Sequence, residues 1–339
     1  VSGRSDRSQR REQQNFLVLF SGHQGSSSIL DGVSRWPGVL VPGFEPLESR
    51  SLSADMKLKY MEAAFDLPRD ADAFPVWRSD MQRCGVRQHD WLYATFEEIE
   101  SKDIVGFKMR PYVRNNTSPR ETVRWSADAY DWTEEQRAGG HSDMAPGMVG
   151  LDPLTVRNLL HRHNVTLVVV TRGNSVKEAL SWYRAREIGL SQWSPENRVL
   201  GTSGTGLLTG EDGVGRVAAP QGEHRHQSIE VDLDEFWDWL LMVESANRAL
   251  EEAPAFFHRP VKHILYEDYA KDNTAALRPL ARLFGLAAQP VFTSFRKATA
   301  GQELPDLVSN FGALCRRLHG TRFFHHLGVT RCPPSPAPV

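Results

Sequence analysis

The segment best suited to chemistry lies at residues 21–28, where the sequence reads SGHQGSSS between a run of strand-forming residues and a helical pattern. Gly22 and Gly25 permit tight backbone turns, and three consecutive serines supply hydroxyl donors where a helix would begin. Backbone amides that converge in such a loop bind phosphate or sulfate. The segment lacks the spacing and the lysine of the nucleotide-hydrolase pattern G-x-x-x-x-G-K-[ST]. It predicts an anion site, and a serine-rich turn that only caps a helix is the alternative.

A second candidate anion site lies in the segment TRGNSVKEALS at residues 171–181, directly after the strongest apolar run. Arg172 stands at the carboxyl end of the expected strand, and Lys177 and Ser181 are four residues apart, so they share one face of the following helix. Basic groups combined with a hydroxyl favour an anion. This site would lie beside the first if the two strands are neighbours. An ordinary charged surface helix is the alternative.

Short apolar runs define the elements that would position these segments. Residues 16–20 and 165–171 are continuous apolar runs rich in β-branched residues, as expected of parallel strands buried on both faces. Further strands are expected at 104–110 and 263–269, and amphipathic helices at 234–253 and 274–286. Strands that alternate with helices predict an α/β fold with a central parallel sheet flanked by helices in three layers, α/β/α.

The chain of 339 residues divides by composition into a core and flexible ends. Residues 1–14 are polar and arginine-rich and predict a flexible arm, and the proline-rich residues 331–339 predict an extended tail. Residues 15–330 are expected to form a single α/β domain. Within it, residues 201–227 contain seven glycines and predict a mobile loop or a disordered segment.

The charge balance excludes several classes of partner. With 40 basic and 42 acidic residues, the formal net charge of -2 gives no overall field that would attract nucleic acid or an anionic membrane. No apolar run approaches the roughly 20 residues that span a bilayer. Three cysteines are too few and too scattered for a disulfide framework or a zinc site, although one bridge is compatible with the sequence. Both a cytoplasmic location and a secretory or Golgi lumen remain open, and oligomeric state is not predicted.

Taken in order, the motifs resemble those of sulfotransferases that use 3′-phosphoadenosine 5′-phosphosulfate (PAPS), and are closest to the carbohydrate branch with the nodulation-factor and trehalose enzymes. The opening loop resembles the 5′-phosphosulfate loop of that family, and TRGNSVKEALS resembles its 3′-phosphate segment. VGFKMR around Lys108, LYEDY at 265–269, FRKAT at 295–299 and LPDLVSNFGALCRRLHGTRF at 304–323 follow in family order. The similarity covers most of residues 16–324 and implies a P-loop-like fold.

The resemblance assigns residues to the donor nucleotide. It implies PAPS as the donor co-substrate, 3′,5′-bisphosphoadenosine as the product, and no metal. The chain departs from the family pattern at His23, where an arginine or lysine is usual, and at Gly173, where a second arginine is expected. The implied ligands are Gln24, Gly25, Ser26, Ser27 and Ser28 for the 5′-phosphosulfate, and Arg172, Ser181 and Lys297 for the 3′-phosphate.

The implied reaction is sulfuryl transfer to a hydroxyl, or to an amine, of a carbohydrate or small metabolite. The acceptor needs a base, and Glu45 follows a short apolar run that would end at the carboxyl edge of the sheet, with Glu48 as a nearby rival. His23 is expected to donate to the sulfuryl oxygens or to protonate the leaving oxygen. A nucleotide-dependent kinase on the related fold and a catalytically inactive nucleotide-binding homologue are the alternatives.

Overall fold

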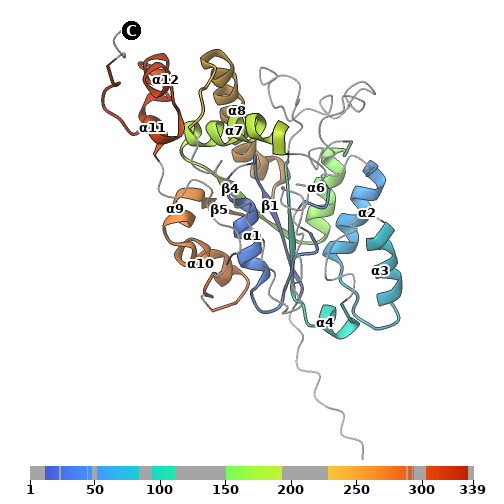
Figure 1. Cartoon of the computed structure of the whole chain (residues 1–339). Helices are drawn as coiled ribbons and strands as arrows, with labels where there is room; N and C mark the ends of the chain where they lie inside the picture. Colours follow the sequence, from blue (N-terminus) through green and yellow to red (C-terminus); the bar gives the residue numbers. More distant parts are fainter. Residues whose placement is uncertain are drawn as a thin grey trace, which may run out of the picture.

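The computed structural model describes residues 12–22, 24–43, 45–47, 52–83, 94–111, 150–192, 228–287, 289–291, 293 and 303–334. Its centre is a five-stranded sheet in the order β2-β3-β1-β4-β5, and every pair of neighbouring strands is parallel (Figure 1). The strands are β1 (Gln14–Leu19), β2 (Val39–Leu40), β3 (Ile104–Met109), β4 (Val165–Thr171) and β5 (Val261–Leu265). The α/β class expected from the apolar runs is confirmed.

Helices cover both faces of the sheet, because successive residues of each buried strand point to opposite faces. From β1, Phe16 and Val18 pack with α1, α9 and α10, whereas Leu17 and Leu19 pack with α2, α3, α4, α6 and the second half of α8. The bounds are α1 (Ser26–Ser34), α2 (Ala54–Phe65), α3 (Phe74–Arg83), α4 (Phe96–Glu100), α6 (Pro153–Arg162), α7 (Ser175–Gln192), α8 (Leu233–Phe257), α9 (Tyr266–Lys271) and α10 (Asn273–Leu283).

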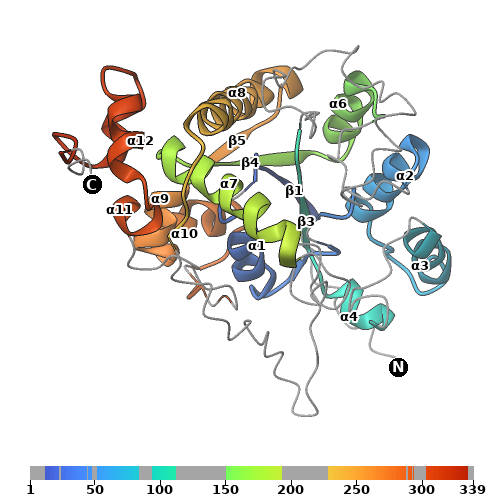
Figure 2. The same ribbon diagram turned by 45° about the horizontal axis from the view of Figure 1, so that its top comes forward.

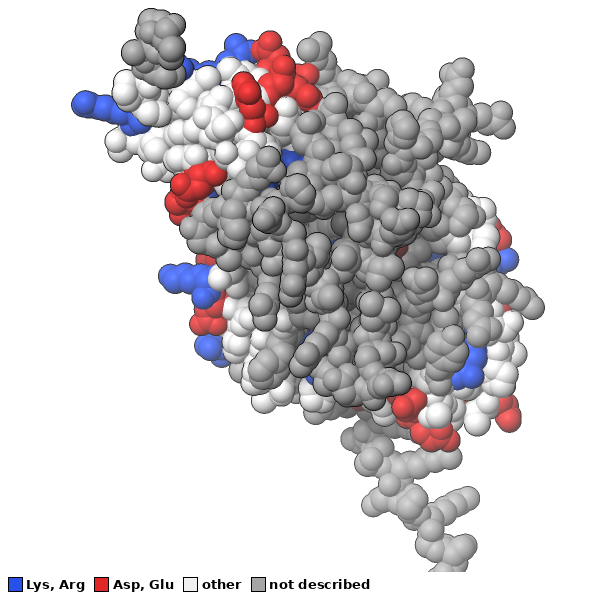
Figure 3. Space-filling model, viewed as in Figure 1, with Lys and Arg blue, Asp and Glu red and all other residues white. Residues whose placement is uncertain are grey.

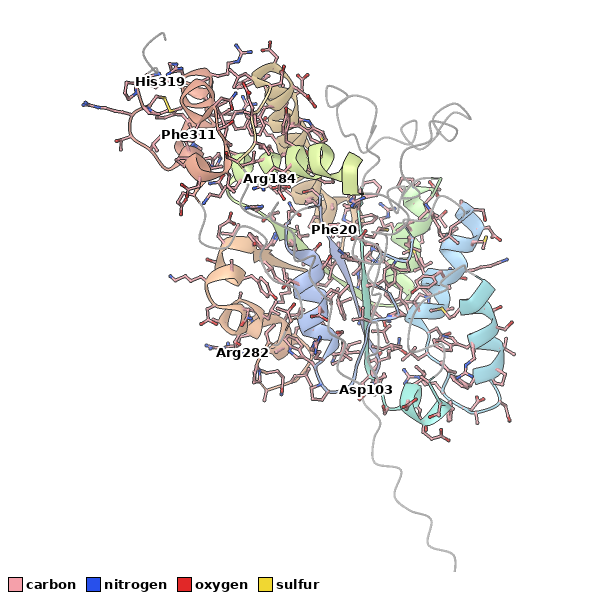
Figure 4. All side chains as sticks on the ribbon, in the orientation of Figure 1. Phe20, Asp103, Arg184, Arg282, Phe311 and His319 are labelled. Carbon is pink, nitrogen blue, oxygen red and sulfur yellow. A yellow bond between two sulfur atoms is a disulfide. The ribbon has the colours of Figure 1, made fainter. Side chains whose placement is uncertain are left out.

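The chain connections leave the sheet toward opposite faces at the carboxyl end of β1. The helix that follows β1 lies on one face of the sheet, whereas the chain that follows the neighbouring strand β4 leads to α8 on the other face. Ligands of open parallel sheets bind where neighbouring strands connect to opposite faces in this way. In Figure 4, Phe20 marks this end of β1 and Asp103 marks the opposite end of the sheet.

One expected strand boundary was wrong. The pattern at 263–269 predicted a single strand, but β5 ends at Leu265 and α9 begins at Tyr266. Glu267 and Asp268 lie in the first turn of this helix, where carboxylates interact favourably with the helix dipole. The change of direction brings Tyr266 over the loop that follows β1, as described below.

A second apolar cluster lies beyond the carboxyl edge of the sheet. It joins α7 and the first half of α8 to α11 (Leu304–Leu307), α12 (Phe311–Leu318) and the 3-10 helix η5 (Phe324–Leu327). Figure 2 shows α7 across the middle of the molecule with α12 beside it. A disulfide between Cys315 and Cys332 ties the C-terminal segment to α12. The single bridge compatible with the cysteine count is therefore present.

Charged side chains of both signs lie next to each other around the margins of the face shown in Figure 3. This arrangement agrees with the nearly balanced composition of the chain. Within the part of the chain that the structure describes, no helix is both long and apolar enough to cross a bilayer.

Candidate active site

The loop after β1 has the backbone that its glycines predicted. Gly22 and Gly25 have φ angles of 119° and 73°, in the region that favours glycine. Gly25 is the N-cap of α1, and its carbonyl accepts the first helical hydrogen bond from Ile29 N at 3.1 Å. The amides at the start of α1 therefore lie at the carboxyl end of β1, and a helix N-terminus in this position is an arrangement that binds anions.

Lys108 supplies the cation that the loop sequence lacks. It lies in β3, where it is paired in register with Val18 of β1, and only 1% of its surface is exposed. Its Nζ donates to Ser27 Oγ at 2.6 Å and to Ser26 Oγ at 3.4 Å, and it lies 4.5 Å from the centre of the Phe20 ring. A buried ammonium group therefore touches the serines of the anion loop from the neighbouring strand.

Glu45 is joined to the same ammonium group. Lys108 Nζ lies 2.5 Å from Glu45 Oε1, and the Glu45 side chain is 9% exposed. Glu45 follows the edge strand β2, which pairs with β3, so two adjacent strands deliver the carboxylate and the lysine to the carboxyl edge. The proposed base thus lies one side chain away from Ser27.

Two aromatic rings pack directly on the glycines of the loop. A Cβ atom at Gly22 would lie 2.2 Å from the Trp182 ring, and one at Gly25 would lie 2.5 Å from the Tyr266 ring. Trp182 comes from α7, where it stacks on Trp239 of α8. These contacts require glycine for space as well as for backbone angle, and they fix the loop against α7 and α9.

Gly25→Ala is therefore expected to weaken anion binding in this loop by about tenfold or more, because the new methyl group would displace Tyr266 and strain the loop. Isothermal titration calorimetry with 3′,5′-bisphosphoadenosine, the ligand expected from the sequence, measures this loss. Gly38→Ala is the matched control, since Gly38 has φ 74° but open space around the added Cβ. Equal affinity of Gly25→Ala and wild type would refute the role of this contact.

The second anion segment lies beside the first, because the two strands that precede them are neighbours in the sheet. β4 pairs directly with β1, and the Arg172 guanidinium lies 5.0 Å from the centre of the Tyr266 ring. Tyr266 thus contacts both Gly25 and Arg172. Ser181 lies on α7, adjacent to the residue that packs on Gly22. The structure brings the two predicted segments together at one edge of the sheet.

An internal carboxylate takes two amides that an anion would otherwise use at the start of α7. Glu267 Oε2 accepts from Gly173 N at 2.9 Å, and Oε1 accepts from Asn174 N at 3.1 Å. Lys177 points elsewhere, since its Nζ pairs with Glu303 at 3.0 Å. A phosphate at this site would depend on side chains such as Arg172, and Gly173 offers no second guanidinium.

Several predicted ligands have other contacts in the structure. The Ser28 hydroxyl lies 2.9 Å from Tyr269 Oη and 3.1 Å from Thr293 Oγ1. The side chain of Gln24 is fully buried and bonds within the protein, so its backbone amide is the group left to face a ligand. His23, Glu48, Lys297 and residues 201–227 lie outside the described residues, so their expected roles stay predictions.

A buried carboxylate behind the loop was not predicted from the sequence. Glu178 on α7 is completely buried and accepts a hydrogen bond from Ser21 Oγ at 2.7 Å. Burial raises the pKa of Glu178 from 4.5 to about 7, against the opposing effects of its hydrogen bonds and of Arg172. A buried carboxyl group with a strongly raised pKa beside an anion site is a candidate for a functional role.

The sequence placed Lys108 and Tyr266 in motifs that resemble those of the family and placed Trp182 next to Ser181, but it did not predict the contacts of these three residues with the loop. Lys108 offered one visible feature, a lysine inside an otherwise apolar strand pattern, which places a cation in a buried position. The contacts of Tyr266 and Trp182 with the loop depend on how distant segments pack. Among the described residues, no group of three or more His, Cys, Asp or Glu side chains is arranged to hold a metal ion.

Comparison with known proteins finds weak structural similarity to two sulfotransferases. One is a sulfotransferase from Alicyclobacillus acidocaldarius, with 13% identity, a TM-score of 0.36, and coverage of 94% of this chain and 97% of that one. The other is the sulfotransferase domain from the curacin biosynthetic pathway, with 13% identity, a TM-score of 0.32, and coverage of 83% and 77%. No protein-family model and no curated protein matches the chain. Both TM-scores are below 0.5, so these similarities carry no argument about function, which depends on the residues of the site.

Proposed function

We propose that the chain is a sulfotransferase that moves the sulfuryl group of PAPS to a hydroxyl or amine of a carbohydrate or small metabolite. The observation that carries this proposal is the contact of Lys108 with both Ser27 and Glu45. One buried cation joins a loop suited to an anionic group and a carboxylate suited to accept a proton. Sulfuryl transfer needs both functions at adjacent points.

In the proposed reaction, Glu45 takes the proton of the acceptor hydroxyl while the oxygen of that hydroxyl attacks the sulfur in line. The new S–O bond forms as the bond from sulfur to the bridging phosphate oxygen breaks, and 3′,5′-bisphosphoadenosine leaves. Lys108 and the amides at the start of α1 stabilise the negative charge on the moving group and on the leaving oxygen. His23 is proposed to protonate or hydrogen-bond that oxygen.

Lys108 explains how the loop could work without a lysine of its own. Phosphate loops use a lysine to neutralise charge on the transferred group. Here the ammonium group reaches the same loop from β3, and its ion pair with Glu45 must open for Glu45 to accept a proton. Arrival of an anionic sulfuryl group beside Ser27 would compete for Lys108 and thereby release the base.

The disulfide bears on the compartment. Disulfides persist mainly where the environment is oxidising, so the Cys315–Cys332 bridge supports a secretory or Golgi lumen over the cytoplasm.

Calorimetry with 3′,5′-bisphosphoadenosine and with ATP distinguishes this proposal from a kinase, because a sulfotransferase is expected to prefer the bisphosphate. Glu45→Gln keeps a hydrogen-bond acceptor for Lys108 but removes the base, so transfer of labelled sulfate is expected to fall about 10²- to 10⁴-fold. Bisphosphate affinity should change little. Glu62→Gln, a surface carboxylate paired with Arg162, is the matched control.

Preference for ATP would overturn the proposal in favour of the kinase. Binding of the bisphosphate by the wild type, with no transfer to a panel of hydroxyl and amine acceptors, would favour the inactive homologue.

A further inference from the structure

Four polar groups form a closed ring of hydrogen bonds behind the anion loop. Ser21 N donates to Gln24 Oε1 at 2.9 Å, and Gln24 Nε2 donates to Asn247 Oδ1 at 2.7 Å. Asn247 Nδ2 donates to Glu178 Oε2 at 3.2 Å, and Ser21 Oγ donates to Glu178 Oε1 at 2.7 Å, which closes the ring. Ser21, Gln24 and Glu178 are each at most 2% exposed.

Two members of the ring fix the direction of every bond in it, because the backbone N–H of Ser21 can only donate and the carboxylate of Glu178 can only accept. The backbone N–H of Ser21 only donates, so Gln24 must present its oxygen to it and its nitrogen to Asn247. Asn247 must therefore present its oxygen to Gln24 and its nitrogen to position 178. The ring closes only if the group at position 178 accepts from Asn247, and a carboxylate does so.

The ring joins the two residues that flank loop positions 22 and 23. It also ties them to α7 through Glu178 and to α8 through Asn247, two helices that pack against each other. Arg172 is close enough to Glu178 for its positive charge to oppose the rise in the Glu178 pKa, so the ring also faces the second anion segment. The loop backbone is thus held by the ring in addition to the contacts of Lys108 with Ser26 and Ser27.

We propose that Glu178 and Asn247 are positioning residues of the donor site, which hold Ser21 and Gln24 in the anion-binding conformation through the fixed polarity of this ring. This inference rests on the proposed function only for the identity of the anion. It assigns a functional role to two residues that need not touch the donor.

Asn247→Asp should break the ring at alkaline pH, where both carboxyl groups are ionised, because it then sets one carboxylate against another across a buried gap. The variants are compared at about pH 9, since a protonated Glu178 would donate to the new carboxylate and close the ring. Glu178→Gln alone should be tolerated: its amide can donate to Ser21 Oγ while its oxygen still accepts from Asn247 Nδ2. The double variant Glu178→Gln/Asn247→Asp should restore the ring, because the new amide donates to the new carboxylate, which also accepts from Gln24. The defect of one substitution is thus corrected by the other.

Two measurements on the full chain test this pattern. Hydrogen–deuterium exchange of the segment at residues 16–34 reports the loop without any ligand, and calorimetry with 3′,5′-bisphosphoadenosine reports the donor site. Asn247→Asp is expected to speed exchange and weaken binding by about tenfold to a hundredfold, the usual effect of a mismatched buried polar group. The double variant should recover most of both losses. Glu251→Gln, on an exposed position of α8, is the matched control.

Failure of the double variant to slow exchange relative to Asn247→Asp would overturn the proposal, as would unchanged exchange in Asn247→Asp. Thermal melting of each variant identifies any that is globally unfolded, and the same comparison with Asn247→Ala and Glu178→Leu then decides whether each ring member is needed. If the exchange pattern holds but wild type does not bind the bisphosphate, the ring stands and the proposed function fails.

Discussion

Lys108→Met is expected to lower sulfuryl transfer by about a hundredfold to a thousandfold, because it removes a preorganised cation from the moving group. It should also lower the free energy of unfolding by about 3–5 kcal/mol, since the largely buried Glu45 carboxylate would lose its contact with the Lys108 ammonium group. Labelled-sulfate transfer and urea denaturation measure the two effects. Lys59→Met is the surface control, because Lys59 pairs only weakly with Asp55 in solvent.

The double variant Lys108→Met/Glu45→Gln separates the two consequences. It removes both charges of the buried pair, so most of the lost stability should return. Transfer should stay low, because this variant lacks both the cation and the base. If transfer returned together with stability, neither Lys108 nor Glu45 would take part in the chemistry.

The sequence was informative wherever a local pattern decides the structure. The apolar run at 165–171 is β4, and the glycines at 22 and 25 have the backbone angles that an anion loop needs. The amphipathic segment at 234–253 lies within α8. In each case the pattern depends on residues close in the chain, so a single sequence contains the necessary information.

The parts of the site that escaped prediction depend on contacts between distant segments. Lys108 meets Ser27 only because β3 pairs with β1, which places residues 81 positions apart within hydrogen-bond distance. Asn247 and Gln24 are 223 positions apart, and nothing near either residue indicates the other. Tyr266 was expected in a strand, where it would not have been placed over Gly25. Tertiary packing, which local patterns do not specify, sets all three contacts.

Glu178→Gln is expected to make the protein more stable than wild type at pH 8, with the advantage vanishing at acidic pH. The pKa of Glu178 rises from 4.5 in the unfolded chain to about 7 in the fold because the carboxyl group is buried. Between these values the folded state binds more protons than the unfolded state, so wild-type stability falls as pH rises from 4.5 to about 7. The loss from this group amounts to about 3 kcal/mol. The glutamine amide does not ionise and is free of it.

Urea denaturation of both proteins at several pH values between 4.5 and 8 measures this effect as the difference between the two free energies of unfolding. Other titrating groups largely cancel in that difference. One of these is His326, whose pKa burial lowers and whose own contribution therefore rises with pH. A difference that stays constant across the range would show that Glu178 does not change its protonation there.

A difference that grows toward pH 8 would mean that the carboxylate at position 178 lowers the stability of the protein at that pH. The ring itself does not explain why position 178 holds a carboxylate, because an amide there also closes the ring. A charge requirement at the adjoining site, with Arg172 as the group that faces Glu178, is then the explanation to test through the pH dependence of bisphosphate affinity in the two proteins.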